Sequence, residues 1–390
     1  MTQRILVLNA GSSSVKFATF ALRDDDPALE LKGQVAGIGQ GTTKLSVSDA
    51  AGKKLDWGSA ASLASHEDAL GLLIDRLDIT ARRADWLGAG HRVVHGGAAF
   101  SAPLRIDGAA IEALAALIPL APLHQPHNVT PIRALHRLLP ELPQVACFDT
   151  AFHTTQPEVA VRFPIPDEYW QQGLRRYGFH GLSYEAILHA LPRVAGSIPE
   201  RLIVAHLGNG ASMAAIRGGR CVASTMGFST LDGLMMGTRP GVIDPGLLLH
   251  LLHGGMSVAR LEKLLYHESG LQGVSGLTSD MKTLLDSSDD KAKLAVAMYC
   301  YRATRELGSL AASLGGVDAL VFTGGVGENA APVRARICEA AAWLGLDFDA
   351  TANAKGGPLV SKAGSRLAAW IVFTDEELTI ARHTRRVLAA

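Results

Sequence analysis

Short apolar runs broken by turns of small residues are the dominant pattern along this 390-residue chain. The first run, Ile5–Leu8, gives way to the small residues 9–14, and apolar positions resume at Val15. Four consecutive apolar residues predict a strand buried on both faces, and Gly11 permits a tight turn after it. Further runs at residues 29–35, 44–47 and 55 predict that the chain opens with an antiparallel meander.

The turn after the first strand has the composition of an anion-binding loop. Gly11 and the serines at 12–14 offer backbone N–H and hydroxyl donors to a phosphate. It is not a Walker loop, because the chain contains no G-x-x-x-x-G-K-S/T motif and Lys16 falls on the second strand. Two interpretations stay open, a phosphate-binding turn and a polar hairpin without a ligand.

The same order of elements recurs in the middle of the chain. An apolar run at 202–207 breaks into the small residues 208–212 and resumes to Ile216. Gly218 and Gly219 then form a turn before a further strand at 221–225. This repetition predicts an internal duplication, in which two similar α/β domains carry two phosphate loops that face a central cleft.

Other segments alternate between strand and helix patterns. Helical spacing occurs at 63–77 and 111–117, and two helices are expected beyond residue 241. The second of these has core positions predicted at Leu294, Met298, Tyr301, Leu307, Leu310 and Leu314. Short buried strands are predicted at 90–94 and 145–148, and the prolines of 119–128 predict a rigid loop there.

Three polar side chains in these segments are candidates for chemistry. Arg92 lies in an apolar strand, where a guanidinium needs an anionic partner, either a ligand or an internal ion pair. Asp149 ends a strand, the place where open α/β sheets present catalytic groups. His180 lies between two glycines, which permit a ligand to approach the backbone, although a structural histidine is equally compatible with this pattern.

Charge and composition narrow the class of partner. The 37 basic and 37 acidic residues balance, so no overall field favours nucleic acid or an anionic membrane, and a small-molecule partner is expected. The four cysteines are scattered and suit a reducing cytoplasm. No signal peptide is expected, and the longest apolar stretch, near 113–123, is too short and proline-broken to span a bilayer.

One segment supports a different class of enzyme. Gly325, Gly327 and Ala330 satisfy a loose G-x-G-x-x-A fingerprint after a predicted strand, with Asp347 and Asp349 near the distance of a ribose contact. A dinucleotide-binding dehydrogenase is therefore an alternative. It explains only this segment and leaves the N-terminal turn, Arg92 and the duplication without a role.

Taken together, eight segments in chain order resemble the acetokinase family, which includes acetate, propionate and butyrate kinases. They are Asn9–Phe17, His91–Gly97, Phe148–His153, Arg176–Gly181, His206–Gly210, Met236–Arg239, Thr323–Asn329 and Thr374–Leu378. The resemblance implies a duplicated actin-like ATPase fold of the ribonuclease H-like type. Domains are then expected at 1–150 and 151–375, with a C-terminal helix at 376–390 that packs back on the first domain.

The resemblance also implies an activity. The chain would phosphorylate acetate reversibly to acetyl phosphate by direct in-line transfer from Mg-ATP, with Mn²⁺ as an alternative metal and ADP as co-product. Propionate is the alternative acceptor. An actin-fold ATPase clamp, with the same fold but no carboxylate arginines, is the competing class. A cytoplasmic homodimer without nucleic acid or membrane partners is expected.

The family's site residues carry over position by position. Catalytic roles would fall to Arg92, Asp149, His180 and Arg239, and magnesium would be held by Asn9 and Glu376. The acyl pocket would comprise Arg92, Val94, Leu123, Phe179 and Thr230. The nucleotide would be lined by Lys16, His206, Leu207, Gly208, Asn209, Gly210, Asp280, Met281, Lys282, Gly325, Val326, Gly327, Glu328 and Asn329.

Four positions depart from the pattern of the family. Lys282 stands where arginine is common, and Ala223 where aspartate is often found. Tyr184 stands where histidine is usual, and Thr230 where a proline is usual. None of these changes removes a catalytic group. The smaller, rotatable Thr230 side chain is expected to relax the wall of the acyl pocket, so that propionate also reacts.

Overall fold

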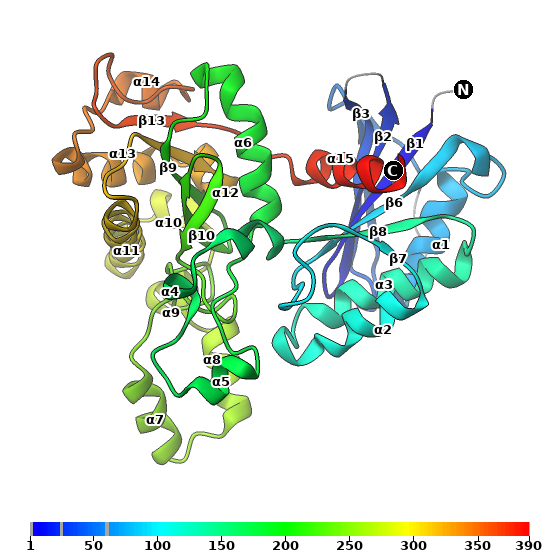
Figure 1. Ribbon diagram of the computed structural model, residues 1–390, viewed down its shortest axis with the longest axis horizontal. Helices are drawn as coiled ribbons and strands as arrows, with labels where there is room; N and C mark the ends of the chain where they lie inside the picture. Colours follow the sequence, from blue (N-terminus) through cyan, green and yellow to red (C-terminus); the bar gives the residue numbers. More distant parts are fainter. Residues whose placement is uncertain (1–2, 24–25, 59–61, 390) are drawn as a thin grey trace. The chain divides into compact units, whose positions relative to one another are not determined.

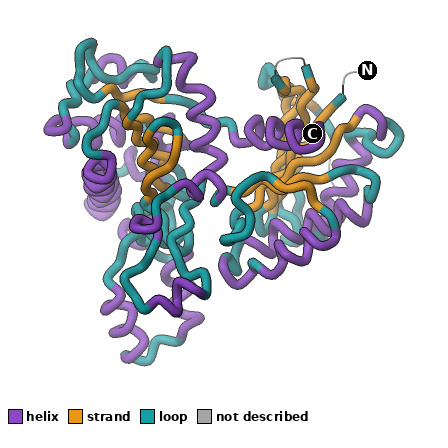
Figure 2. Tube along the Cα trace, in the orientation of Figure 1, coloured by secondary structure: helices purple, strands orange, loops and turns teal. Residues whose placement is uncertain are grey.

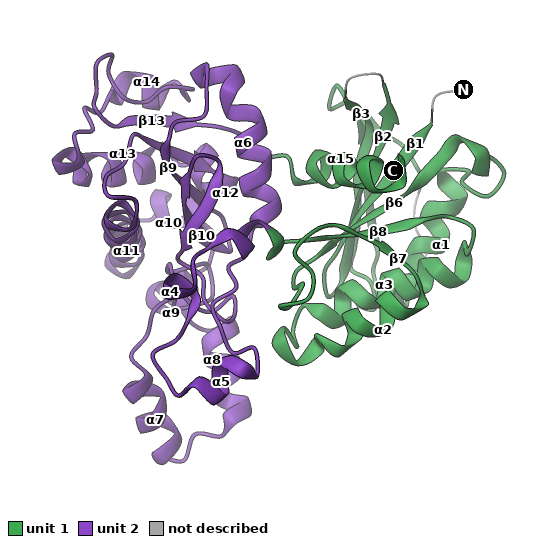
Figure 3. Ribbon diagram, viewed as in Figure 1, with its two compact units in different colours: residues 1–151, 375–390 green, residues 152–374 purple. Residues whose placement is uncertain are grey.

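The computed structural model describes residues 3–23, 26–58 and 62–389, and it divides into two compact units (Figure 3). Unit 1 comprises Met1–Ala151 together with Asp375–Ala390, and unit 2 comprises Phe152–Thr374. The C-terminal helix α15 (Glu376–Ala389) packs on β1 (Arg4–Ala10) and β6 (Trp86–Val93) of unit 1 (Figure 1). The chain thus passes from unit 1 to unit 2 after Ala151 and returns to unit 1 at Asp375.

Unit 1 is built on an eight-stranded sheet in the order β5-β4-β3-β2-β1-β6-β8-β7. Strands are drawn in orange in Figure 2. Strands β1 to β5 form the predicted antiparallel meander, whereas β1, β6 and β8 run parallel. The remaining strands are β2 (Ser14–Leu22), β3 (Pro27–Ala36), β4 (Lys44–Asp49), β5 (Lys54–Leu55), β7 (Leu104–Ile106) and β8 (Gln144–Phe148). Residues Ile5–Leu8 are at most 1% exposed, as four consecutive apolar residues predicted.

Unit 2 repeats the central part of this topology in a five-stranded sheet with the order β11-β10-β9-β12-β13. Its strands are β9 (Arg201–Leu207), β10 (Ala211–Arg217), β11 (Arg220–Ser224), β12 (Ala319–Thr323) and β13 (Ala368–Ile371). Strands β9 to β11 are antiparallel, and β9, β12 and β13 are parallel. Because β3-β2-β1-β6-β8 has the same order and directions, the predicted duplication and the α/β class are confirmed.

Helices cover both faces of the unit 1 sheet. On one face α1 (His66–Arg76) and α3 (Gln125–Leu138) share a core with the strands through Leu70, Leu73 and Leu135. On the other face α15 lies so close to β6 that a Cβ at Gly90 would meet Thr384 and Ile380. None of the helices in the described parts of the chain is both long and apolar enough to cross a membrane.

The other helices of the two units have the following bounds. Unit 1 also contains α2 (Gly108–Ala116). Unit 2 contains α4 (Glu158–Val161), α5 (Asp167–Gln171), α6 (Gly181–Ala195), α7 (Pro245–His253), α8 (Val258–His267), α9 (Gly270–Ser275), α10 (Met281–Asp286), α11 (Asp290–Leu314), α12 (Gly324–Asn329), α13 (Ala331–Ala340) and α14 (Ala350–Ala354).

The rigid loop predicted at 119–128 is wrong in its second half. Helix α3 already begins at Gln125, and Pro126 occupies its first turn. A proline is well tolerated there, because the N–H that it lacks would have no partner inside the helix. The prolines that predicted a loop thus mark the start of a helix instead.

The predicted core stripe of α11 is also partly wrong. Leu307, Leu310 and Leu314 are buried, but Leu294 is 54% and Tyr301 64% exposed. The buried side chains of the first half of α11 are Ala292, Ala295, Val296, Tyr299 and Cys300. The buried face therefore lies one or two positions away from Leu294 and Tyr301, and two of its members are alanines, which give only a weak apolar signal.

Candidate functional site

The carboxyl ends of β6 and β8 bring Arg92 and Asp149 of unit 1 together. These strands are parallel neighbours, with Arg92 opposite Cys147 in the register. Arg92 donates from Nε to Oδ1 of Asp149 at 3.1 Å and from Nη2 to Oδ2 at 2.6 Å. Asp149 is only 1% exposed, and a Glu376 carboxylate oxygen lies 3.6 Å from Arg92 Nε. The internal ion pair that the sequence left open is therefore present.

The Arg92 guanidinium stays protonated in this environment. Burial alone would lower the pKa of its guanidinium, but the charges of Asp149 and Glu376 outweigh burial and raise the pKa above its usual value. The flanking histidines are different, because burial lowers the pKa of both His91 and His95 to about 4. Arg92 is thus the cation of this segment, and its two histidine neighbours are neutral.

Acidic side chains outnumber cations at the start of α15. Burial raises the pKa of Glu377, and the charges of Glu376 and Asp375 raise it further. A metal cation would relieve this repulsion, so the donor chemistry fits magnesium. No three His, Cys, Asp or Glu side chains form a ligand cluster within residues 3–23, 26–58 and 62–389. A cation here would therefore depend on few protein ligands and on water, as magnesium commonly does.

The N-terminal turn is tied to the end of β6 by Asn128. The turn closes with the N–H of Gly11 donating to the carbonyl of Ser14 at 2.8 Å. Asn128 donates to the Ala10 carbonyl at 3.3 Å and accepts from the Val94 N–H at 3.0 Å. Sequence analysis missed Asn128, because a buried amide inside a helix leaves no periodic signal.

In unit 2, His180 and Arg239 meet beside Gly210. A Cβ on Gly210 would lie 2.8 Å from Arg239 Nη2 and 3.4 Å from His180 Nε2. His180 has the left-handed φ of 59° and immediately precedes α6, which turns its ring toward β10. The ring stacks on that of His206, with centroids 4.3 Å apart and planes inclined by 18°. His180, which lies between two glycines, and Arg239 thus belong to one cluster.

Arg239 is a cation without a carboxylate partner among the described residues. Its Nη1 donates to the Thr230 carbonyl at 2.8 Å, and it forms no ion pair within residues 3–23, 26–58 and 62–389. Although the side chain keeps some exposure, burial lowers the pKa of its guanidinium. A partly desolvated cation facing a glycine is a favourable place for an anion.

The segments expected to line a nucleotide also gather in unit 2. A Cβ at Gly324 would lie 2.9 Å from the Leu207 carbonyl oxygen, which places α12 beside the end of β9. A Cβ at Gly237 would meet both Asn209 and Ser279, which brings the start of α10 next to the same turn. Residues Gly325–Asn329 lie in α12, Met281 and Lys282 in α10, and Asp280 caps α10. Lys16 is exposed on β2 of unit 1.

Several of these nucleotide-segment side chains already have internal partners. Glu328 Oε1 accepts from the N–H groups of Gly324 at 3.0 Å and Thr374 at 3.1 Å. Asp280 accepts from Thr283, whose hydrogen bonds lower the pKa of the carboxyl. These two carboxylates therefore shape the segments, and the glycines and backbone groups around them are left for a ligand.

The residues expected for the acyl pocket have different exposures. Val94 and Phe179 are buried, Leu123 is half-buried, and Thr230 is 9% exposed. Phe179 is held by His153, which donates from Nε2 to its carbonyl at 2.9 Å. Thr230 offers its carbonyl to Arg239, so this departure from the family pattern lies directly beside the free cation.

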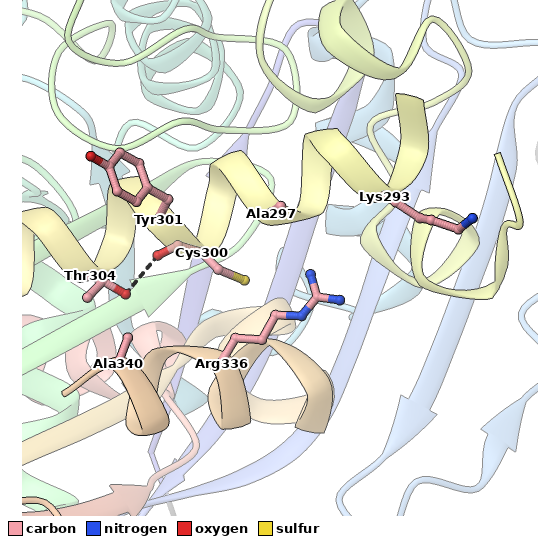
Figure 4. A pocket seen from close by; sticks show the side chains of 7 residues that line it. All are labelled: Lys293, Ala297, Cys300, Tyr301, Thr304, Arg336 and Ala340. Carbon is pink, nitrogen blue, oxygen red and sulfur yellow. Dashed lines mark hydrogen bonds between the residues drawn. The ribbon is translucent and has the colours of Figure 1, made fainter. Parts of the chain in front are cut away.

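A separate cavity of about 540 Å³ lies between α11 and α13 (Figure 4). It is lined by Lys293, Ala297, Cys300, Tyr301, Thr304, Arg336 and Ala340. None of these is a predicted site residue. Tyr301, which was wrongly predicted to be a core residue, lines this cavity and not the candidate site.

Comparison with known proteins extends over the whole chain. The sequence model of the acetokinase family matches residues 4–382. An acetate kinase of Rhodopseudomonas palustris is 50% identical over 394 residues, covering 99% of this chain and 99% of that protein. Solved structures agree. A propionate kinase from Francisella tularensis superposes with a TM-score of 0.92 at 35% identity over 99% of this chain and all of that one. The structure of Porphyromonas gingivalis acetate kinase superposes with a TM-score of 0.89 at 37% identity, over 99% of this chain and all of that one.

Proposed function

This chain belongs to the acetokinase family, and on that premise we propose that it transfers a phosphoryl group reversibly between ATP and acetate. A carboxylate oxygen of acetate attacks the γ-phosphorus, and the bond from that phosphorus to the β-phosphate oxygen breaks. The products are acetyl phosphate and ADP. The observation that supports this proposal most directly is the cation of Arg239, which lies beside His180 without a carboxylate partner among the residues described.

Neutralisation of charge is the main requirement of this reaction. The transferring group spreads negative charge over three oxygens while an anionic acceptor approaches it. We propose that Arg239 and His180 bind these oxygens and that Arg92 binds the acetate carboxylate. Acetate has a pKa near ~4 to 5 and is already ionised at neutral pH, so no general base is required. Asp149 then orients Arg92 through the two hydrogen bonds described above.

The co-substrates have proposed places in the same units. ATP and ADP are assigned to the segments 206–210, 280–282 and 325–329, with Lys16 contributing charge. Asn9 and Glu376 would hold magnesium, largely through water. When bound, this ion would offset charge on the nucleotide phosphates. The dehydrogenase alternative is dropped, because the family match covers the fingerprint segment together with the rest of the chain.

A homodimer and a cytoplasmic location complete the proposal. Helix α7 has no buried residue, and Leu247 and Leu249 on it are 45% and 55% exposed, which supports α7 as part of an interface. Sedimentation of the purified protein tests the dimer. The cytoplasm is proposed because ATP is the phosphoryl donor.

The activity is tested by trapping its product. Purified protein with Mg-ATP, acetate and hydroxylamine is expected to form acetohydroxamate, because hydroxylamine attacks acyl phosphates. ATP consumption should depend on acetate and match the hydroxamate formed. ATP hydrolysis that ignores acetate and yields no hydroxamate would favour the ATPase clamp instead.

Selectivity for acyl size is a second prediction. We expect kcat/KM to fall from acetate to propionate and further to butyrate, since one methylene changes pocket affinity by about 1 to 3 kcal/mol. Thr230→Pro should increase the preference for acetate by restoring a fixed ring. This variant is suitable because no hydrogen bond from the Thr230 N–H occurs within the described chain.

The matched control for that variant is Thr230→Ser, which keeps the hydroxyl and the backbone freedom. It should leave the ratio of acetate to propionate close to that of the unchanged protein. If kcat/KM for propionate exceeds that for acetate severalfold, the protein would be assigned as a propionate kinase. An unchanged ratio in Thr230→Pro would remove residue 230 from the account of selectivity.

A further inference from the structure

We infer that the start of α9 holds Arg239 in place and that Gly270 is the positioning residue, because its missing side chain lets the Arg239 turn dock directly on this helix. The Arg239 turn comprises residues Met236–Arg239. The inference rests on the proposed function for its catalytic consequence, but not for its geometry. Gly270 lies outside every segment that was expected to line the site.

The Arg239 turn is docked on the first residues of α9 through the backbone. The carbonyl oxygens of three successive residues of the turn accept from N–H groups at the start of the helix. The pairs, donor first, are Leu271 with Met236 at 2.9 Å, Gln272 with Gly237 at 2.9 Å and Ser269 with Thr238 at 3.0 Å. The first N–H groups of a helix have no acceptor within the helix, so the turn supplies the acceptors that α9 lacks. The turn and the start of α9 therefore form one hydrogen-bonded unit.

Gly270 lies where the helix approaches the turn most closely. A Cβ built on it would lie 2.2 Å from the Met236 carbonyl oxygen, and 2.8 and 2.9 Å from the carbonyl oxygen and the nitrogen of Arg239. All three are backbone atoms, so no side chain can rotate away to make room. Gly270 also has a φ of +62°, which residues with a Cβ rarely adopt. A side chain at position 270 must therefore push the turn and the helix apart.

Helix α9 is also held in unit 2 by packing that does not involve the turn. Leu271 on this helix is 1% exposed, and α9 packs on the long helix α11. The turn has a further contact of its own, because the Gly237 N–H donates to the Asn209 carbonyl at 2.9 Å. Since α9 is held independently, at least part of any separation falls on the turn and therefore on Arg239.

Displacement of the turn would move the Arg239 guanidinium within the candidate site. Its Nη1 donates to the Thr230 carbonyl at 2.8 Å, and its Nη2 lies 2.8 Å from the place that a Cβ on Gly210 would occupy. Transition-state contacts depend steeply on distance and direction, so a misplacement of about 1 Å can cost about a hundredfold in rate. Gly270 thus acts on the proposed reaction through Arg239 and not by contact with a substrate.

Gly276, directly after α9, provides a matched control. Its φ of +67° is close to that of Gly270, but a Cβ built on it would meet nothing within 4 Å among the described residues. Gly270→Ala and Gly276→Ala therefore impose similar backbone strain, and only Gly270→Ala introduces a contact with the Arg239 turn. We expect Gly276→Ala to keep the turnover of the unchanged protein.

The test observes Arg239 by NMR spectroscopy of protein labelled with ¹⁵N-arginine. Its Nε–H resonance is identified as the one that disappears in Arg239→Lys. We expect this resonance to shift in Gly270→Ala and to keep its position in Gly276→Ala, because only the first variant displaces the turn. In Gly270→Ala kcat should fall about tenfold to a hundredfold, whereas KM for acetate and for ATP should change by less than about twofold.

Thr238→Val keeps the test decisive if Gly270→Ala fails to fold. The Thr238 hydroxyl donates to the carbonyl of Tyr266, in the last turn of α8, at 2.7 Å and so ties the same turn to the segment that leads into α9. Valine removes this hydrogen bond without adding a clash. The Arg239 resonance should again shift, and kcat should fall about fivefold, which corresponds to one ordinary hydrogen bond. Thr238→Ser keeps the hydroxyl and should retain more turnover than Thr238→Val.

An unshifted Arg239 resonance in Gly270→Ala would overturn the inference, as would equal losses of kcat in Gly270→Ala and Gly276→Ala. Where Gly270→Ala does not fold, an unshifted resonance in Thr238→Val would overturn it in the same way. The NMR outcomes do not depend on turnover. If acetohydroxamate is not formed while the resonance shifts as expected, the proposed function fails and the positioning of Arg239 stands. If acetohydroxamate forms and the resonance does not shift, the inference fails alone.

Discussion

Replacing Arg239 by alanine lowers kcat by a factor of about a hundred or more and leaves the folded protein at least as stable as before. Arg239 is a cation that burial disfavours and that no carboxylate in the described chain compensates. Its charge is useful only when an anion is bound. The transition state of the proposed transfer places such an anion beside Gly210, so the loss should appear mainly in kcat.

Arg239→Lys and Arg336→Ala complete this experiment. Lysine restores the charge but not the planar fork that donates to two acceptors at once, so it should rescue activity only in part. Arg336 is another guanidinium of unit 2 without an ion pair in the described residues, and it lines the distant cavity between α11 and α13. Arg336→Ala should leave kcat unchanged. Near-normal turnover of Arg239→Ala at saturating acetate would show that Arg239 is structural.

Hydrophobic periodicity predicted the central strands of the two sheets, because the pattern of apolar residues in a strand depends on that segment of sequence alone. The runs at 5–8 and 202–207 are strands at equivalent places in the two sheets, and each is followed by the expected turn. The two predictions that were wrong also concern single segments, namely the starts of α3 and α11. Pro126 lies in the first turn of a helix. The buried face of the first half of α11 contains Tyr299 and its neighbours on that face, not Leu294 and Tyr301. In both places packing with other segments decided the outcome.

The partners of the candidate site residues could not be predicted in the same way. Arg92 and Asp149 are 57 residues apart, and Ser212 lies 32 residues from His180. Only the pairing of strands brings them within hydrogen-bond distance. The family resemblance named Arg92, Asp149 and His180, but it carried no information about Ser212, whose Oγ lies 2.8 Å from His180 Nδ1. This contact became visible only from the distances in the folded chain.

Arg92→Gln is expected to impair both activity and stability, unlike Arg239→Ala. Asp149 is 1% exposed, so the variant removes the guanidinium that forms an ion pair with this buried carboxylate. Breaking a buried ion pair from one side costs about 3 to 5 kcal/mol, and the value here should lie near the lower end, since the Arg92 side chain is 21% exposed. Denaturant unfolding of the purified variant measures this loss, and kcat should fall about a hundredfold or more.

A double-mutant cycle with Asp149→Asn separates the two roles of Arg92. Asparagine keeps the shape of the side chain but removes the charge, so the double variant no longer buries a carboxylate that has lost the Arg92 guanidinium. Its free energy of unfolding should exceed that of Arg92→Gln, with a coupling of about 1 to 3 kcal/mol. Its turnover should remain low, because no guanidinium is left for the carboxylate of acetate. If stability and turnover recover together, the pair serves only the fold, and Arg92 has no direct part in binding acetate.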